Sequence, residues 1–216
     1  MRARLLFLAL FALPGAAEVV DRVALSAGLQ VVTDSAIRRQ LRLDAFFQER
    51  ALDVSPAARR EAARRLLDQL LIRREVELSR FAPVAVADVR KQIAALREER
   101  RQDESAFDAA LRRAGLSDQD LFDYVQWQIT LARFIDFRFR PGVQVGEDEV
   151  RVYYQGEFLE LLRKQPGPQS APPPLEKVRS QIMEILVNRK IDGAMDQWLD
   201  QVRQQVKIRW REEAFQ

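Results

Sequence analysis

Apolar side chains surround most of one predicted helix, which begins near Ser117 and ends near Phe139. When successive residues are placed about 100° apart, its polar residues collect in one narrow wedge. The wedge consists of Asp123, Gln126, Thr130 and Arg133. A helix on a protein surface needs only about a third of its perimeter to be apolar. We therefore expect this helix to lie at the centre of the core, and the alternative is that it offers a second contact face to a peptide or a partner helix.

The chain has no histidine and no cysteine among its 216 residues. These absences exclude thiol nucleophiles, disulfides, Cys/His zinc sites and iron–sulfur clusters. They also exclude a Ser-His-Asp triad, so any acid–base chemistry would need carboxylates, tyrosine or lysine. Because glycine occurs only 8 times and leucine, alanine, arginine, glutamate and glutamine are abundant, the fold is expected to be mainly α-helical.

The first 17 residues have the layout of a secretory signal peptide. A basic start, Met1–Arg4, precedes an apolar run, Leu5–Leu13, which is too short to span a bilayer. Small residues follow, and cleavage is expected after Ala17; the alternative is a buried N-terminal helix. We therefore expect an exported, periplasmic protein without an integral membrane span. Loss of Arg2 and Arg4 lowers the formal net charge from +3 to +1, which argues against a nucleic-acid partner.

Start and stop signals divide the remaining chain into elements. A hairpin of two strands, 19–26 and 29–33, comes first, and a closing strand, 206–210, comes last. Prolines crowd the segment 164–174, which should be an extended linker. Gly193 is a predicted weak point in the final helix. Helices are expected to begin near residues 33, 55, 88, 103, 117, 146 and 175.

No group of residues stands out as a catalytic centre. The consecutive acids Glu147, Asp148 and Glu149 suggest a metal site, but acidic residues are also favoured at a helix N-terminus, and we prefer that interpretation. The glycines match neither the Walker pattern nor the dinucleotide-binding pattern. The sequence therefore predicts no catalytic, cofactor-binding or metal-binding residues.

Several stretches of packing residues follow one another in an order that is typical of one family. Each motif is weak alone, and their order and spacing carry the likeness. Together they resemble the SurA family of periplasmic chaperones, whose N-terminal domain corresponds to most of 19–163 and whose C-terminal helix and strand correspond to 176–210. The stretches are Val20–Leu25 with Gly28 and Val31–Ser35, Leu66–Ile72, Phe107–Tyr124 with Gln128–Ile129 and Phe134–Ile135, Val143–Val145 with Glu149–Tyr154, and Glu176–Trp210.

The chain departs from that family in one important place. SurA relatives carry parvulin isomerase domains between the sixth helix and the C-terminal helix, and each domain needs on the order of 90–100 residues. Here that position holds only the linker 164–174. The resemblance thus implies a helical chaperone domain, 18–163, and a C-terminal helix and strand, 175–216, that dock back on it. The first five or six helices would form a bundle, and the closing strand would join the hairpin in a small three-stranded sheet.

The resemblance also implies a function, which is an ATP-independent periplasmic holdase for unfolded outer-membrane or secreted proteins. It raises the outer-membrane assembly machinery as a further partner, and no cofactor is expected. One alternative is a peptidyl-prolyl isomerase, against which the missing parvulin segment argues. Another is a structural or adaptor protein of the envelope. The residues expected to contact clients through an apolar groove are Phe46, Phe47, Trp127, Phe134, Phe137 and Tyr154.

Overall fold

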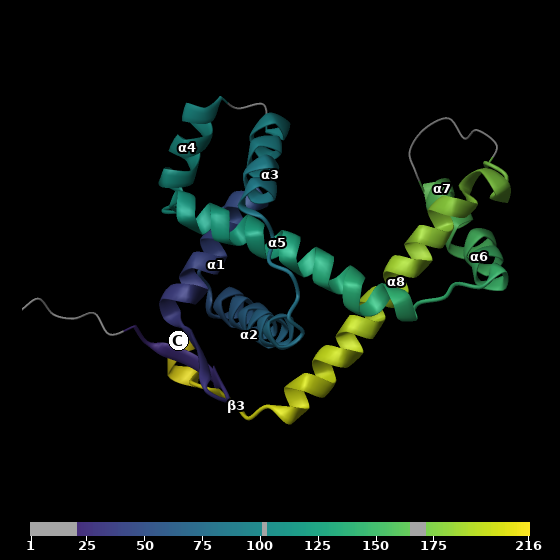
Figure 1. Ribbon diagram of the computed structural model, residues 1–216. Helices are drawn as coiled ribbons and strands as arrows, with labels where there is room; N and C mark the ends of the chain where they lie inside the picture. Colours follow the sequence, from purple (N-terminus) through teal and green to yellow (C-terminus); the bar gives the residue numbers. More distant parts are fainter. Residues whose placement is uncertain (1–20, 101–102, 165–171) are drawn as a thin grey trace, which may run out of the picture.

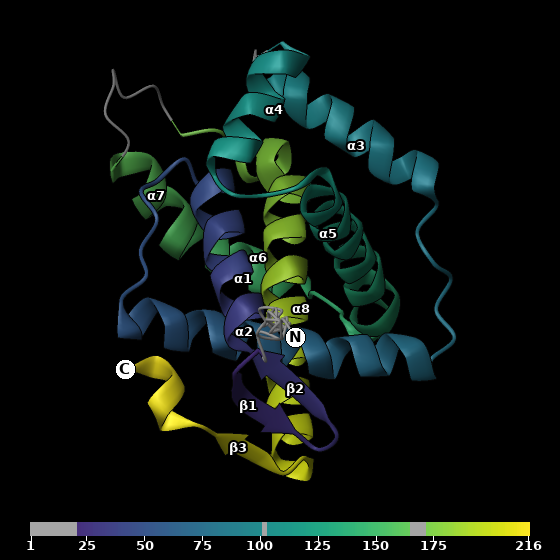
Figure 2. The same ribbon diagram turned by 90° about the vertical axis from the view of Figure 1, so that its left-hand side faces the viewer.

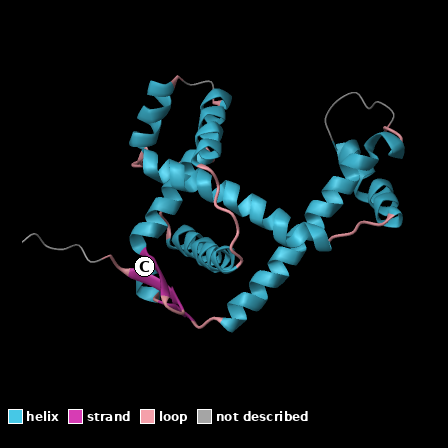
Figure 3. Ribbon diagram, viewed as in Figure 1, coloured by secondary structure: helices cyan, strands magenta, loops and turns pink. Residues whose placement is uncertain are grey.

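The computed structural model describes residues 21–100, 103–164 and 172–216. The predicted signal peptide, residues 1–17, and most of the predicted linker lie outside these ranges. The described chain is mainly α-helical with one small sheet, as the sequence predicts (Figure 3). The elements are β1 (Val23–Ala27), β2 (Gln30–Thr33), α1 (Asp34–Phe47), α2 (Pro56–Leu78), α3 (Val86–Glu99), α4 (Glu104–Arg113), α5 (Asp118–Phe139), α6 (Glu147–Tyr153), a π-helical segment (Tyr154–Phe158), α7 (Leu159–Lys164), α8 (Leu175–Gln205) and β3 (Ile208–Trp210), with short 3-10 turns at Arg140–Gly142 and Glu212–Phe215.

The predicted starts of α2 and α5 are confirmed by their hydrogen bonds, whereas α3 begins at Val86, two residues before the predicted start, and has no side-chain cap. The Ser55 hydroxyl accepts a bond from the Ala58 amide at 3.3 Å, and Pro56 occupies the first position of α2. At α5, the Asp120 amide donates to the Ser117 hydroxyl at 3.1 Å, while the Ser117 amide donates to the Asp120 carboxylate at 2.9 Å. Each arrangement satisfies amides that the first helical turn leaves unpaired.

The three-stranded sheet joins segments from the two ends of the described chain. Its strand order is β2-β1-β3, and both pairings are antiparallel. Gly28 turns the chain between β1 and β2 with a φ of +62°, a conformation that glycine adopts without strain. β3 pairs with the other edge of β1, so that Leu25 lies opposite Trp210 (Figure 2). The sheet therefore joins the first and last segments of the described chain, an arrangement that the family resemblance implied.

α5 lies between two hydrophobic clusters, and this position explains its apolar perimeter. On one side, Trp127 and Phe134 pack into a cluster with the sheet, α1, α2 and the C-terminal half of α8. On the other side, Leu121 and Val125 pack with α3, α4 and the C-terminal end of α1. The central position that we favoured from the sequence is the one the structure has, because each side of α5 faces a different core (Figure 1).

α8 also spans two clusters, and it runs through Gly193 without a break. Its C-terminal half contributes Leu199 to the cluster around the sheet. Its N-terminal half packs through Ile182 against Val150 of α6, in a third cluster that lies away from α1–α4 (Figure 1). The sixth predicted helix therefore does not join the bundle of the first five. Instead, α8 connects it to that bundle. Within the described ranges, no helix is both long and apolar enough to cross a membrane.

Candidate functional site

An open groove of about 400 Å³ lies between α3 and α5, beside the C-terminal end of α1. α3 and α5 pack against each other, and an ion pair of 2.8 Å between Asp88 and Arg133 links them. The groove is mostly apolar. Its lining residues are Phe47, Gln92, Leu96, Tyr124, Val125, Gln128, Ile129 and Ala132.

Helical spacing places these side chains in facing stripes. Tyr124, Gln128 and Ala132 recur every four residues of α5, so they lie along one side of that helix. Gln92 and Leu96 have the same spacing on α3. The groove therefore follows α5 for about two turns and α3 for about one, a shape that suits an elongated ligand.

The end of α1 is fixed by one arginine. The Arg100 guanidinium lies 4.5 Å from the centre of the Phe46 ring and donates hydrogen bonds to the carbonyl oxygens of Phe46 and Phe47, at 2.9 and 3.4 Å. A cation at a helix C-terminus is favoured by the exposed carbonyl groups and the helix dipole. Arg100 therefore holds Phe47 at the edge of the groove, where its ring stacks on Tyr124.

Among the residues that the structure describes, no formally charged side chain lines the groove. Burial, with a smaller contribution from the Asp44 carboxylate, raises the pKa of Tyr124 above its usual value, although a hydrogen bond with the Gln128 side chain opposes this shift. The phenol is therefore neutral at physiological pH. The amides of Gln92 and Gln128 are exposed and can both donate and accept hydrogen bonds. The groove can thus bind an uncharged apolar segment and also pair with exposed peptide groups.

The six candidate residues lie in different surroundings. Phe46, Trp127 and Phe134 are buried, with 9%, 4% and 1% of their surfaces exposed, and they pack in the cores on the two sides of α5. Phe137 is 61% exposed and contacts Phe81, outside the groove.

Of the remaining two candidates, Tyr154 is half-buried beside Phe158, and its hydroxyl donates to the Pro173 carbonyl oxygen at 2.8 Å. Phe47 is the one member of the six that lines the groove. The structure thus brings Phe47 together with seven residues that the sequence analysis did not single out as a site. For four of them, Tyr124, Val125, Ile129 and Ala132, the signal was the apolar perimeter of α5. Which part of that perimeter faces a core and which part lines the groove depends on where the other helices pack.

The consecutive acids at the start of α6 are used in ion pairs. Glu147 pairs with Arg179, and Glu149 lies 2.6 Å from the Lys190 ammonium group. Glu149 also accepts the Gly146 amide at 2.8 Å, in the manner of a helix N-terminal cap. No cluster of three or more acidic side chains with metal-binding geometry occurs in the described ranges.

These features define a mainly α protein in which a small antiparallel sheet joins the terminal segments and a central helix borders an apolar groove. Comparison with known protein families finds no family that matches this chain, and comparison with curated proteins finds no match.

Proposed function

We propose that the protein is an ATP-independent holdase that shields unfolded outer-membrane or secreted proteins in the periplasm. The observation that supports this proposal is the uncharged groove between α3 and α5. An exposed apolar groove with a few polar groups on its rim is typical of peptide-binding surfaces. The periplasmic location rests on the N-terminal sequence, and the likeness to SurA adds to the case.

The ligand that suits this groove is an extended segment with aromatic or aliphatic side chains. Such side chains would contact the apolar residues Val125, Ile129 and Leu96 in the groove wall. Each Å² of apolar surface removed from water would stabilise the complex by about 25 cal/mol. Gln92 and Gln128 would pair with the peptide groups of the client, which an unfolded chain leaves free. A small groove gives weak and rapidly reversible binding, which a chaperone without an energy source needs for release.

The proposal is tested by light scattering during the aggregation of an unfolded outer-membrane porin. The mature protein, starting after Ala17, should slow aggregation at stoichiometric amounts. Ala132→Glu should remove most of this protection, because it places a charge in the groove at an exposed position that contributes to no hydrophobic cluster.

Ala94→Glu is the matched control, since Ala94 is an exposed alanine of α3 that does not line the groove. It should protect as well as the unchanged protein does. Absence of protection by the unchanged protein would contradict the proposed function. Equal loss of protection in Ala132→Glu and Ala94→Glu would show that the groove is not the client-binding surface.

A further inference from the structure

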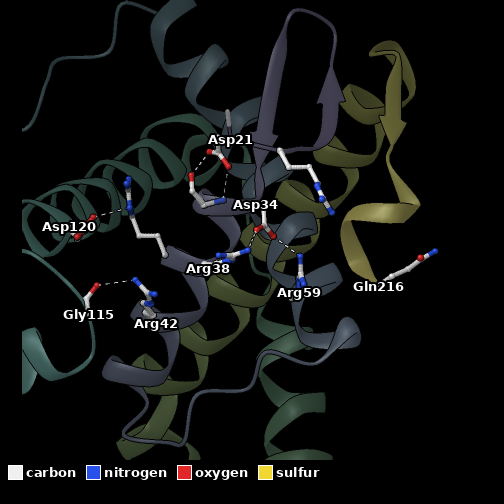
Figure 4. Close-up of a pocket in the computed structure, with 11 residues that line it drawn as sticks. Asp21, Asp34, Arg38, Arg42, Arg59, Gly115, Asp120 and Gln216 are labelled. Atoms are coloured by element: carbon white, nitrogen blue, oxygen red, sulfur yellow. Dashed lines mark hydrogen bonds and ion pairs between the residues drawn. The ribbon is translucent and has the colours of Figure 1, made fainter. Parts of the chain in front are cut away.

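A second cavity, of about 730 Å³, lies along α1 and is bordered by the residues just before β1, by α2, by the start of α5 with the turn before it, and by the C-terminal residue of the sequence (Figure 4). Five arginines and three aspartates contribute to its wall. In Figure 4, Asp34 and Arg38 lie between Arg42 on one side and Arg59 on the other. The lining residues are Asp21, Arg22, Asp34, Ser35, Arg38, Arg39, Arg42, Arg59, Gly115, Asp120 and Gln216.

The spacing of α1 explains why its arginines gather there. Arg39 follows Arg38 directly, and Arg42 lies three positions after Arg39. At about 100° per residue, the three side chains fall within an arc of about 100° and project from one side of the helix. The buried residues Ile37 and Leu41 belong to the other side, which faces the core. The arginine side of α1 therefore stays open to solvent.

The three aspartates of this cavity are already occupied. Asp21 accepts hydrogen bonds from the amide and the hydroxyl of Ser35, and these bonds lower the pKa of its carboxyl group. Asp34 pairs with Arg38 and Arg59.

Asp120 accepts from Ser117 and lies 2.9 Å from Nε of Arg39. Although burial acts in the opposite direction, the hydrogen bonds from Ser117 and the neighbouring arginines lower the pKa of Asp120. The carboxylates of Asp21 and Asp120 are therefore ionised at neutral pH, and all three carboxylates are directed at partners within the protein.

Two of the five arginines form no ion pair at contact distance with a carboxylate in the described part of the chain, although Arg42 lies near enough to Asp120 to lower the pKa of that carboxyl group. The Arg42 side chain donates only to the Gly115 carbonyl oxygen, at 3.2 Å, and the Arg22 side chain makes neither a hydrogen bond nor an ion pair there, although the Arg22 carbonyl oxygen accepts from the Asp34 amide at 2.8 Å. Both side chains are exposed. The side chains that line the cavity carry five guanidinium groups and three carboxylates, a formal surplus of two positive charges, and the side chains of Arg22 and Arg42 have donors left to bind a ligand.

We propose that this cavity binds a phosphate monoester. The dianion matches the two uncompensated positive charges, and the planar guanidinium group donates to phosphate oxygens in a two-pronged arrangement. The cavity is also far larger than a phosphate group, so it leaves room for the organic part of the ester. The site lies apart from the groove between α3 and α5, and it does not depend on the proposed chaperone function.

Calorimetric titration of the mature protein with glycerol 3-phosphate tests the proposal. We expect saturable binding of one molecule per chain, which weakens as salt is added. Arg42→Ala and Arg22→Ala should each lower the affinity about tenfold, the effect of losing one charge-assisted interaction. Because the Arg22 side chain is exposed and makes no hydrogen bond or ion pair with the described residues, Arg22→Ala should fold and keeps the test valid even if Arg42→Ala unfolds.

Arg74→Ala is the matched control, because Arg74 is an exposed arginine of α2 that lies outside the cavity and whose side chain makes no hydrogen bond or ion pair with the described residues. It should bind as the unchanged protein does. Absence of saturable binding, or equal loss in Arg74→Ala and Arg22→Ala, would overturn the proposal.

Vesicles of phosphatidylcholine with and without phosphatidic acid then distinguish the sources of the ester. Binding of both the phosphatidic-acid vesicles and glycerol 3-phosphate supports a lipid headgroup. Binding of glycerol 3-phosphate alone supports a soluble ester. Binding of the vesicles, or of an acidic peptide, without binding of glycerol 3-phosphate would overturn the proposal.

Discussion

The ring of Phe47 lies almost parallel to the ring of Tyr124, with 4.3 Å between their centres and 19° between their planes. This contact joins the last residue of α1 to α5, and both rings line the apolar groove. The neighbouring ring of Phe46 instead meets Phe107 edge-on at 5.5 Å in the core. Two adjacent phenylalanines thus have different roles, one in packing and one at the proposed client surface.

Replacement of Phe47 by alanine should lower the free energy of unfolding by about 1–2 kcal/mol, because a half-buried ring and its stacking contact are lost. Protection of an unfolded porin should fall as well, since the variant removes one wall of the groove. Urea unfolding and the aggregation assay measure the two effects. Leu29→Ala, at a fully exposed position of the hairpin turn, should change neither. A Phe47 variant that protects as well as the unchanged protein would contradict a role of this ring in client binding.

Phe134 and Phe137 should differ sharply in their effects on stability. Phe134→Ala should cost about 3–5 kcal/mol, because the ring is 1% exposed in the main core. Phe137→Ala should cost about 0.5 kcal/mol, since that side chain is 61% exposed. The midpoints of urea unfolding measure both values. Similar midpoints for the two variants would be inconsistent with this packing.

Arg203 of α8 should matter for stability because it compensates a carboxylate of α2. Its Nε and Nη2 atoms lie 2.9 and 2.7 Å from one oxygen of Asp68. Burial raises the pKa of Asp68 above its usual value of 3.8, and Arg203 opposes that rise. Arg203→Met should therefore lower the free energy of unfolding by about 1–2 kcal/mol at pH 7.

The loss should diminish as the pH falls, because the uncompensated Asp68 carboxyl takes up a proton more readily in the folded than in the unfolded chain. Urea unfolding at pH 7 and near pH 3 measures this difference. Arg151→Met, which breaks an exposed pair with Asp148, is the control and should have almost no effect at either pH. An Arg203 variant with the same loss at both pH values would contradict this account of the pair.

The packing of α6 on α8 should weaken in acid. Glu157 accepts two hydrogen bonds from Arg189, at 2.9 and 2.8 Å, and these bonds lower its pKa below the usual value of 4.5. The pKa of Glu149 is lowered in the same way by Lys190. A lowered folded pKa means that the contribution to stability is complete above about pH 4.5 and is lost as the pH falls through the folded value.

Amide chemical shifts around Glu149 and Glu157, followed by NMR from pH 6 to pH 3, should therefore show the loss of these two ion pairs, while the buried contact of Val150 with Ile182 persists. The double variant Glu149→Gln with Glu157→Gln should respond less to pH, because its side chains do not titrate in that range. If the variant and the unchanged protein respond to pH in the same way, titratable groups other than Glu149 and Glu157 cause the change.

Truncation after Pro174 should destabilise the main bundle as well as the region around α6. The lost segment contains β3, which pairs with β1, and Leu199, which is 4% exposed in the main core. Circular dichroism during heating measures the effect. A truncated chain with an unchanged melting midpoint would show that residues 175–216 form a separate appendage. Leu199→Ala should lower the free energy of unfolding by about 2–5 kcal/mol without removing the strand.

Much of the local structure was predictable because it depends on residues close together in the chain. Ser55 with Pro56, and Ser117 with Asp120, identified the starts of α2 and α5, since each cap involves residues at most three positions apart. Gly115 marked the end of α4, and its φ of +69° in the structure is one that glycine tolerates. The small sheet was anticipated from the order of motifs together with the family resemblance, because no local signal states which strand β3 pairs with.

The candidate site was predictable only in part, because side-chain accessibility depends on distant residues. The sequence by itself determined a helix 117–139 that is apolar on nearly every side. It did not distinguish Phe134, which is buried in the core, from Tyr124, which lines the groove. Tertiary structure decided that α2 and α8 cover one side of this helix, that α3 and α4 cover another, and that the stripe of Tyr124, Gln128 and Ala132 stays partly open. The physical reason is that a periodic pattern records which side chains avoid water, whereas the helices packed around them decide which remain within reach of a client.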